Sequence, residues 1–323
     1  MSETLKNKYQ VCEEIGRGRF GIISRVFCPE TQASFASKSI DKRLLTDPLD
    51  RQCLENEPKI MTLLPPNSNI LQIHGMSESE HTLELILDLC QPHTLYDKIL
   101  QRPHLSEPEA ASYMQQLMSG LAHCHRFGIV HRDVKPDNVF FDFRGNLKIG
   151  DFGSATWLGE LGTVDGLVGT PYYVAPEIVM RRAYNEKVDV WSAGVVLYVM
   201  LAGVPPFNGE TAEEIFEAVW RGNLRFPRRV FRSVSSEVKD LLRKMICRDV
   251  GKRLSAEQVL TKLCQRDWIV DITWIAQNEN RAANALAKST DTSELNVVHL
   301  NNPPTSLLPL LIHHASCISM DSI

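Results

Sequence analysis

Residues 9–90 carry short runs of apolar and polar residues in the alternation that is typical of β-strands. The runs are rich in β-branched and aromatic side chains, which pack well on the pleated surface of a sheet. They predict strands at Tyr9–Ile15, Ile22–Phe27, Ser34–Ile40 and Thr82–Leu89. One segment among them, Asp50–Leu64, has the period of a helix instead, and its apolar side is formed by Leu54, Ile60, Met61 and Leu64.

From Leu95 onward the apolar positions recur with the period of helices. Ser106, Pro108 and Glu109 form a helix start, because a capping Ser is followed by a Pro in the first turn and by a Glu three residues past the cap. The helix that begins there covers Ala110–Phe127. Later helical patterns cover Val188–Leu201, Ala212–Arg221, Ser236–Cys247 and Ala256–Leu263.

Together these patterns predict an α+β fold with two lobes. The N-lobe is small and β-rich, at about residues 9–90, and the C-lobe is larger and α-helical, at about residues 91–269. Beyond Ala276 the periodicity fades into polar, Asn-rich and Pro-containing sequence. Residues 277–323 are therefore predicted to form a poorly ordered C-terminal tail.

One apolar stretch, Val190–Val204, has the hydropathy of a membrane segment. It is shorter than the roughly 18–20 apolar residues that a helix needs to span a bilayer. Asp189 opens the stretch and Pro205 closes it. We therefore expect a buried helix and no membrane partner.

The composition narrows the function classes further. The chain has 323 residues, with 35 Lys and Arg against 39 Asp and Glu, for a formal net charge of −4. This slightly acidic balance argues against a dedicated binder of nucleic acid or of membrane surfaces. The polar N-terminus, Met1–Gln10, lacks the apolar core of a secretory signal, and none of the eight cysteines forms a C-x-x-C pair. Both features predict free thiols in the reducing cytoplasm.

Cys124, which lies between His123 and His125, has two interpretations. It could be a metal ligand, or it could be a buried thiol on a helix. The second is favoured, because no further ligand cluster lies at the spacing of a zinc site.

The segment Gly16–Ile23 contains three glycines in the order G-x-G-x-x-G, directly after a predicted strand. A dinucleotide-binding turn shares this pattern, but it requires a helix directly after the glycines. Here a second strand follows. The pattern therefore indicates a hairpin in which Gly16, Gly18 and Gly21 let backbone N–H groups approach phosphate oxygens without interference from Cβ atoms.

Lys38 lies among apolar residues of the next predicted strand, from which it can reach the phosphates beneath the hairpin. A lysine in such surroundings needs an anionic partner, since burying it alone is costly. Glu57 on the predicted helix is the candidate partner and Glu55 is the alternative. The alternative interpretation is that Lys38 is a solvated surface lysine, which its apolar neighbours disfavour.

The segment His131–Asn138, with the sequence HRDVKPDN, carries the strongest chemical signal. Asp133 is placed to accept a hydrogen bond from an attacking hydroxyl and to take its proton. Lys135 adds positive charge near a transferring phosphoryl group. Asn138 and Asp151 supply the hard oxygen ligands that Mg²⁺ prefers.

In these segments the chain resembles the eukaryotic protein kinases, over about residues 9–269. The residues that carry the resemblance are Gly16–Ile23, Lys38, Glu57, His131–Asn138, Asp151–Gly153, Ala175–Glu177, Asp189–Gly194 and Arg253. The resemblance implies that ATP lies between the lobes with its adenine against Asp88–Cys90, and that Arg253 pairs with Glu177. It further implies that ATP contacts Ile15, Ile23 and Ala36.

The resemblance also implies the substrate class. Lys135 and the segment Gly169–Tyr173 are similar to those of the Ser/Thr branch, in which Thr170 would brace Asp133 and Lys135. A phosphorylation site is the alternative role for Thr170. Basophilic relatives carry a Glu where this chain has Thr94, so we expect a moderate preference for Arg or Lys before the target residue. The acidic residues that could bind such side chains are Asp97, Asp137 and Glu217.

Within that branch the lobes are similar to the calcium-dependent protein kinases. No D-x-[DN]-x-[DN]-G loop occurs in the sequence, so we expect no intrinsic calcium sensor. Segments Pro29–Thr31 and Asp50–Glu57 are similar to those of the plant phosphoenolpyruvate carboxylase kinases. This resemblance would make that carboxylase the protein substrate.

Arg132 would usually await a phosphate on the activation segment. We expect activity without it, with Glu160 or Asp165 supplying the charge. Candidates for phosphorylation remain at Ser154, Thr156 and Thr163.

Two rival functions make different predictions. A pseudokinase scaffold predicts loss of Lys38, Asp133 or Asp151, and the sequence retains all three. A phosphotransferase that acts on small molecules would lack the peptide-docking segment Gly169–Glu177, which is also present.

Overall fold

The computed structural model describes residues 8–18 and 21–264. The chain divides into two units, Met1–Leu260 and Thr261–Ile323. The predicted tail at 277–323 lies outside the described residues, and the architecture below is that of the first unit.

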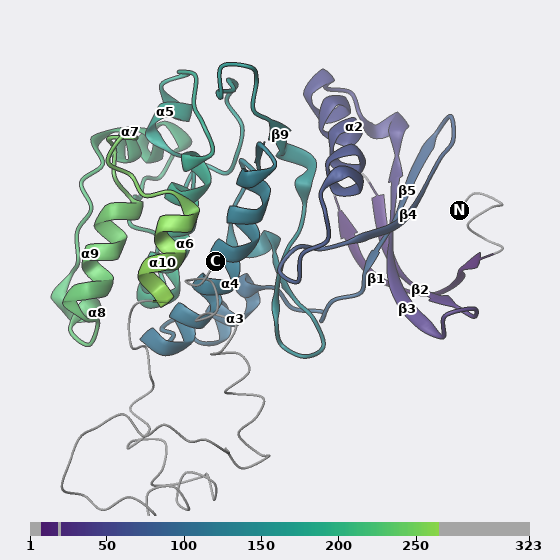
Figure 1. Ribbon diagram of the computed structural model, residues 1–323, viewed down its shortest axis with the longest axis horizontal. Coiled ribbons are helices and arrows are strands. Elements are labelled where there is room, and N and C mark those ends of the chain that lie inside the picture. Colours follow the sequence, from purple (N-terminus) through teal and green to yellow (C-terminus); the bar gives the residue numbers. More distant parts are fainter. Residues whose placement is uncertain (1–7, 19–20, 265–323) are drawn as a thin grey trace, which may run out of the picture. The chain divides into compact units, whose positions relative to one another are not determined.

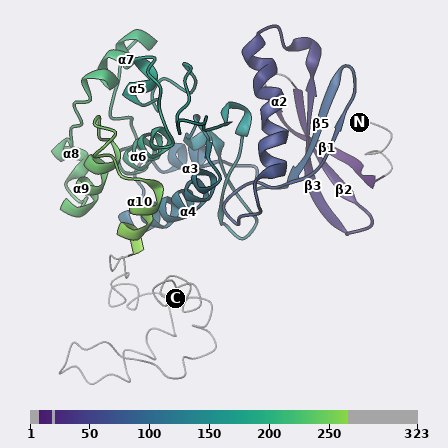
Figure 2. The same cartoon turned by 45° about the horizontal axis from the view of Figure 1, so that its top comes forward.

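The β-rich part is a five-stranded antiparallel sheet with the strand order β1-β2-β3-β5-β4 (Figure 1). Its strands are β1 (Gln10–Gly18), β2 (Gly21–Cys28), β3 (Ala33–Asp41), β4 (Ile73–Glu78) and β5 (Thr82–Asp88). Helix α2 (Pro48–Leu63) lies beside this sheet in both ribbon views (Figures 1 and 2). The four predicted strands and the predicted helix are all present, with ends that differ by a few residues.

Strand β4 was not predicted. It is an edge strand that pairs only with β5, and none of its residues is buried. An edge strand with polar residues and a central Gly75 gives no run of β-branched positions, so its pairing with β5 is visible only in the folded chain.

The α-rich part follows β5 and confirms the predicted two-lobed α+β architecture. Its helices are α3 (Leu95–Gln101), α4 (Glu107–Arg126), α5 (Pro176–Val179), α6 (Lys187–Ala202), α7 (Ala212–Arg221), α8 (Arg228–Phe231), α9 (Ser236–Met245) and α10 (Ala256–Cys264). Two short antiparallel pairs complete it, formed by β6 (Ile129–Val130) with β9 (Thr156–Trp157) and by β7 (Val139–Phe141) with β8 (Leu147–Ile149). The turns η1 (Lys42–Leu44), η2 (Pro136–Asn138) and η3 (Phe152–Ser154) are 3₁₀ helices.

Helix α4 begins where its cap predicts. The Ser106 hydroxyl accepts a hydrogen bond from the Glu109 backbone N–H at 3.4 Å, which satisfies one of the donors left open in the first turn. The later helices α6, α7, α9 and α10 also lie at their predicted positions, and the bounds of α7 match the prediction.

Helix α6 forms the centre of the α-rich part. All of its residues from Val188 to Ala202 are buried, as expected for the apolar stretch. It ends at Gly203, whose φ of +71° and whose contact with Pro103 leave no space for a side chain. Among the described residues no helix is long and apolar enough to cross a membrane.

An ion pair is buried in this part of the fold. Arg253 is 1% exposed and donates two hydrogen bonds to the Glu177 carboxylate, at 2.5 and 2.9 Å. The same guanidinium donates to the Cys247 and Lys187 carbonyls, at 2.9 and 3.1 Å. The pair therefore joins α5 to the start of α6 and to the loop before α10.

Replacing Glu177 by Ala should destabilise the protein by about 3–5 kcal/mol, because Arg253 would keep a buried charge without its counterion. Urea unfolding followed by circular dichroism measures this change. The control is Glu217→Ala, which breaks an exposed pair with Arg221 and should cost less than about 1 kcal/mol. Equal losses in the two variants would contradict the structural role of the buried pair.

Candidate active site

The glycine-rich segment is a β-hairpin. Gly18 pairs with Gly21 and Gly16 pairs with Ile23 across β1 and β2, while the tip at 19–20 lies outside the described residues. Because strand β2 follows the glycines, the dinucleotide-binding alternative does not apply. The glycines differ in role: a Cβ on Gly18 would meet nothing within 4 Å, whereas one on Gly21 would lie 1.7 Å from the Ser39 carbonyl oxygen. Gly21 thus permits close strand packing and Gly18 leaves an open backbone.

Lys38 on β3 is joined to α2 by an ion pair. Its Nζ donates to both carboxylate oxygens of Glu57 at 2.8 Å and lies 3.9 Å from Oδ1 of Asp151. Burial would lower the pKa of Lys38, but the charges of Glu57 and Asp151 outweigh it and raise that pKa. The lysine is therefore a cation held between two acids and not a solvated surface residue.

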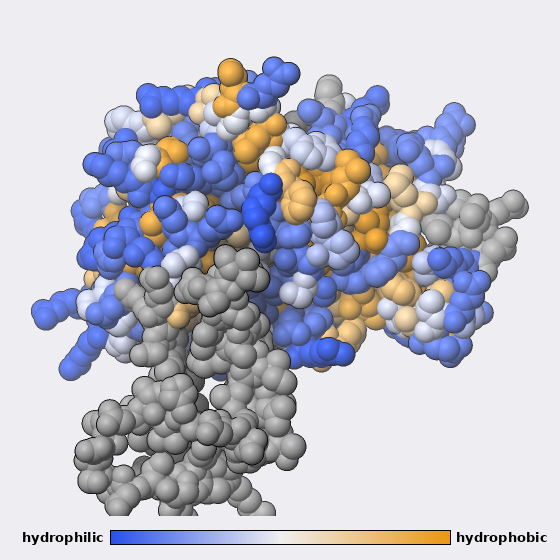
Figure 3. All heavy atoms as spheres, in the orientation of Figure 1, coloured by the Kyte–Doolittle hydropathy of each residue, from blue (hydrophilic) through white to orange (hydrophobic). Residues whose placement is uncertain are grey.

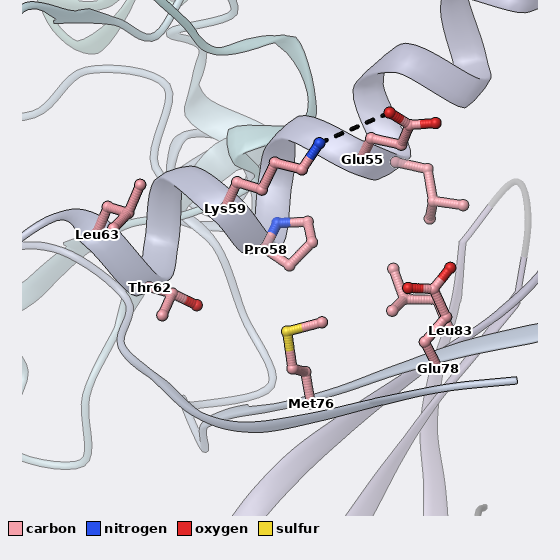
Figure 4. Close-up of a pocket in the computed structure, with 9 residues that line it drawn as sticks. Glu55, Pro58, Lys59, Thr62, Leu63, Met76, Glu78 and Leu83 are labelled. Atoms are coloured by element: carbon pink, nitrogen blue, oxygen red, sulfur yellow. Dashed lines mark ion pairs between the residues drawn. The ribbon is translucent and has the colours of Figure 1, made fainter.

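Glu55, the alternative partner of Lys38, pairs with another lysine (Figure 4). Glu55 lies on the face of α2 that lines a pocket with Pro58, Thr62 and Met76, and its carboxylate is 3.7 Å from Lys59 (Figure 4). Glu57 is only 4% exposed and does not line this pocket. The two glutamates are two residues apart on a helix, so they lie on different faces.

Asp133 is the centre of the loop that follows β6. Its Oδ2 accepts from Lys135 Nζ at 2.7 Å and from Asn138 Nδ2 at 3.2 Å, and its Oδ1 accepts from the Thr170 hydroxyl at 2.8 Å. Lys135 Nζ also donates to the Thr170 oxygen at 3.0 Å. Thr170 thus uses its hydroxyl to brace the acid and the lysine, which leaves the phosphorylation alternative for this residue without support.

Two buried groups, whose roles the sequence analysis did not assign, hold this loop. The Asp189 carboxylate accepts from the backbone N–H groups of His131 and Arg132, at 2.9 and 2.8 Å, and from the His125 ring at 2.9 Å. Burial alone would raise the pKa of Asp189, but these hydrogen bonds and the nearby imidazoles keep it below its usual range. The sequence did contain a signal for this role, because Asp189 is a single acid at the start of an apolar helix.

His131 is the second of these groups. Its Nδ1 accepts from the Asp133 backbone N–H at 3.3 Å, and its Nε2 lies 3.1 Å from the Gly150 carbonyl oxygen. A carbonyl can only accept, so in this arrangement Nε2 donates and Nδ1 accepts. His131 thereby links the Asp133 loop to the segment that carries Asp151.

Asn138 and Asp151 could hold a divalent metal ion. The Asn138 Nδ2 group makes both hydrogen bonds of this side chain, to the Asp133 carbonyl at 2.9 Å and to its carboxylate, so Oδ1 stays available. The Asp151 carboxylate is 48% exposed, on a backbone with φ of +58°. Within the described residues no group of three or more His, Cys, Asp and Glu side chains could form a metal site. Two oxygen donors fit Mg²⁺, which is commonly held by one or two side chains together with substrate phosphates and waters.

In the segment expected beside adenine, Asp88–Cys90, hydrogen bonds hold the first side chain, Asp88, in place. The Asp88 carboxylate accepts from His74 at 2.7 Å, from Lys148 at 2.9 Å and from the Gln72 backbone N–H at 3.2 Å. Burial alone would raise the pKa of Asp88, but these donors, led by His74, lower it. The Asp88 backbone N–H also donates to the Gln72 carbonyl, at 3.0 Å, so the side chain and the N–H of Asp88 are both engaged within the protein.

The other residues expected to contact ATP line the same side of the sheet region. Ala36 is buried opposite Leu87 on β5, Ile23 lies opposite Lys38, and Ile15 at the hairpin is 45% exposed. At Cys90, burial and the charge of Asp88 raise the thiol pKa to about 12. Cys90 is therefore a neutral contact and not a nucleophile.

Cys124 is a buried thiol. The neighbouring His123 ring lies 2.9 Å from the Pro65 carbonyl, while the His125 ring hydrogen-bonds Asp189, so both imidazoles are committed elsewhere.

Arg132 differs from its expected state. It donates to the Ser154 carbonyl at 2.6 Å, to the Tyr184 hydroxyl at 3.4 Å and to the Asp165 backbone carbonyl at 3.5 Å. In the described part of the chain no ion pair joins Arg132 to a carboxylate, so neither Glu160 nor Asp165 pairs with it directly. Neutral oxygens satisfy the guanidinium instead.

The three acids expected near a basic substrate are not equivalent. Asp97 accepts from the Thr94 backbone N–H at 2.8 Å and from its hydroxyl at 3.0 Å, which forms the cap of α3. Glu217 pairs with Arg221 at 2.5 Å. Asp137 is exposed and makes no ion pair among the residues described here. Asp137 is thus the acid most open to a substrate.

Comparisons with known proteins agree with this geometry. Residues 9–269 match the protein kinase domain family. The chain is 38% identical over 261 residues to calcium-dependent protein kinase 33 of Arabidopsis thaliana, a match that covers 80% of this chain and 50% of that protein. It is 40% identical over 273 residues to calcium-dependent protein kinase 19 of the same plant, covering 83% and 48%. Calcium-dependent protein kinase 3 of Oryza sativa subsp. japonica is 37% identical over 283 residues, covering 87% and 49%. The chain spans about half the length of these relatives.

Proposed function

The chain belongs to the protein kinase family, and from this premise we propose that it transfers the γ-phosphate of ATP to a Ser or Thr hydroxyl of another protein. The observation that supports this most directly is the set of contacts around Asp133. Lys135, Asn138 and Thr170 each donate a hydrogen bond to the Asp133 carboxylate, and the Thr170 oxygen also accepts from Lys135.

In this proposal Asp133 is the catalytic base. Its carboxylate accepts the hydrogen bond of the attacking hydroxyl and takes its proton. Lys135 stabilises the negative charge of the transferring phosphoryl group, since it is a cation 2.7 Å from Asp133. Thr170 keeps both side chains in place.

The ATP site comprises the hairpin glycines, Lys38 and the Asp88–Cys90 segment. Lys38 binds the α- and β-phosphates, and Glu57 orients it. Asn138 and Asp151 would hold Mg²⁺, which when bound neutralises phosphate charge. The distance of 3.9 Å between Lys38 and Asp151 supports the proposal that both residues act on the same phosphates.

The rival functions receive less support. A scaffold without turnover would not need Lys38, Asp133 and Asp151 in mutual reach, and a kinase of small molecules would not need Thr170 from a peptide-docking segment. The hydrogen bonds of Thr170 to Asp133 and Lys135 favour a protein hydroxyl as acceptor.

We further propose that phosphoenolpyruvate carboxylase is the substrate and that turnover does not require calcium. The similarity of two segments to the plant carboxylase kinases supports the substrate. The relatives are calcium-dependent by name, and the sequence shows no calcium-binding loop of the EF-hand type. The free thiols of the described cysteines fit the cytoplasm as location.

Replacing Glu57 by Gln should lower kcat/KM for a generic Ser peptide roughly 10²-fold, because Lys38 loses the charge that orients it toward the phosphates. The matched control is Glu55→Gln on the same helix, which should stay within about two-fold since its partner is Lys59. Steady-state assays with labelled ATP measure both. Similar losses in the two variants would refute the assignment of Glu57.

Phosphatase treatment should leave turnover unchanged within about two-fold, because neutral oxygens already satisfy Arg132. The treated enzyme is separated from the phosphatase and assayed, and mass spectrometry verifies removal of phosphate. The triple variant Ser154→Ala, Thr156→Ala and Thr163→Ala should behave in the same way. Abolished turnover in both preparations would show that Arg132 requires a phosphate.

Purified protein with labelled ATP and Mg²⁺ should phosphorylate phosphoenolpyruvate carboxylase in EGTA, and EDTA should stop the reaction. EGTA removes calcium and spares magnesium, so the two chelators separate the ions. Label on a generic peptide without label on the carboxylase would reject the narrow substrate and keep the kinase. Loss of all label in EGTA would reject calcium independence.

A further inference from the structure

A cluster of arginines lies on the α-rich part, at and around the short helix α8. Its members, the arginine cluster, are Arg225, Arg228, Arg229 and Arg232, and all four are exposed. The whole chain has a formal net charge of −4, so four cations within eight residues are a local reversal of its charge.

These arginines have no counterions of their own. Within the described residues, no member of the cluster makes a side-chain hydrogen bond or an ion pair, whereas Arg17, Arg25, Arg43, Arg102 and Arg221 each pair with a carboxylate. Two acids that flank the cluster in the sequence are also engaged, because Glu217 pairs with Arg221 and Asp240 pairs with Lys244. Four guanidinium groups therefore face solvent with unused donors.

Aromatic packing fixes the backbone beneath the cluster. The Phe226 and Phe231 rings contact each other at 5.1 Å and both contact Tyr198 of α6, at 6.2 and 4.8 Å. The Tyr198 hydroxyl donates to the Arg225 carbonyl at 3.0 Å. The Arg243 guanidinium lies 4.9 Å from the centre of the Phe226 ring and does not join the exposed set.

This packing fixes the backbone that carries the arginines. Arg228 and Arg232 are four residues apart on helical backbone, so they lie on one face, and Arg229 is next to Arg228. Phe231 fills the opposite, buried side. A backbone that is already fixed loses less conformational entropy when a ligand binds than a mobile loop does, and this favours a role of the cluster in recognition.

We propose that the arginine cluster is a docking surface for an acidic segment of a protein partner. A guanidinium matches a carboxylate in a two-point fork, and a group of four such cations suits a run of Asp or Glu in an extended chain. In Figure 3, hydrophilic side chains project at the end of the molecule where Figure 1 places α8.

A short acidic peptide fits better than an extended polyanion. Helix α9 begins next to the cluster and carries Glu237 and Asp240, and Glu107 of α4 accepts from the Ser235 backbone N–H. A membrane or a nucleic-acid duplex would meet these acids together with the arginines. A single strand of peptide can follow residues 225–232 alone. The cluster contains no residue of the candidate active site, so the proposal stands or falls apart from the proposed function.

The test is fluorescence anisotropy of a labelled poly-Glu peptide with the full-length chain, without ATP. The protein should bind this peptide and should not bind a matched poly-Gln peptide. Affinity should fall steeply between ~50 and ~300 mM KCl, because exposed charges are screened. Binding of both peptides alike would overturn the proposal.

The variant carries Arg225→Gln, Arg228→Gln, Arg229→Gln and Arg232→Gln, and should bind poly-Glu at least ~10-fold more weakly, as expected for several exposed ion pairs. The matched control changes Arg43, Arg102, Arg126 and Arg144 to Gln, which alters the net charge equally, and should stay within about two-fold. An equal effect of both variants would show a general charge effect and overturn the proposal.

Two further measurements protect the interpretation. Each single Arg→Gln variant is tested for binding and for its melting temperature, so that a quadruple variant that fails to fold does not decide the result. Loss of poly-Glu binding in folded single variants supports the proposal. Tighter cluster-dependent binding to duplex RNA or to phosphatidylserine vesicles than to poly-Glu would assign the surface to a different partner and overturn it.

Discussion

The ion pair between Lys38 and Glu57 is the constraint on which the rest of the site depends. Burying the Glu57 carboxylate without a counterion would cost folding free energy, so the fold requires the pair. The pair in turn forms only where β3 and α2 lie close enough for Lys38 Nζ to reach both carboxylate oxygens. That separation also brings Lys38 to within 3.9 Å of Asp151, which comes from a different part of the chain. One electrostatic requirement thus positions the sheet, the helix and the segment after β8 around the same small volume.

In the α-rich part, buried charged side chains hold loops in place and have no proposed role in catalysis. Asp189 is enclosed by apolar helix residues, yet it is satisfied by two backbone N–H groups and one imidazole. Arg253 and Glu177 do the same for the segment that begins α5 and for the loop before α10. Such groups would destabilise the fold if any partner were missing, since each would leave an unsatisfied charge. Their complete satisfaction explains how loops without regular secondary structure can present Asp133 and Asn138 with defined geometry.

The sequence was sufficient for elements and residues whose signal is local. Periodicity predicted the long helices, because each buries one face or, in α6, all faces. The order of glycines, lysine and acids predicted which side chains meet, including Glu57. It did not predict β4, which buries no side chain, nor the engagement of Asp88 by His74 and Lys148. These features arise from pairing across long sequence separations, and no pattern within one segment encodes them.

The same distinction bears on how a protein substrate is selected. The sequence suggested three acids for binding basic side chains, but the fold uses Asp97 to cap a helix and Glu217 to pair with Arg221. Two of the three acids therefore have partners within the protein, and Asp137 is the one of the three that stays open. In the proposed reaction, one open acid gives little selectivity for basic residues beside the target hydroxyl. Contacts away from that hydroxyl must then contribute more of the binding free energy, and they can do so without slowing transfer because they act equally on the ground state and the transition state.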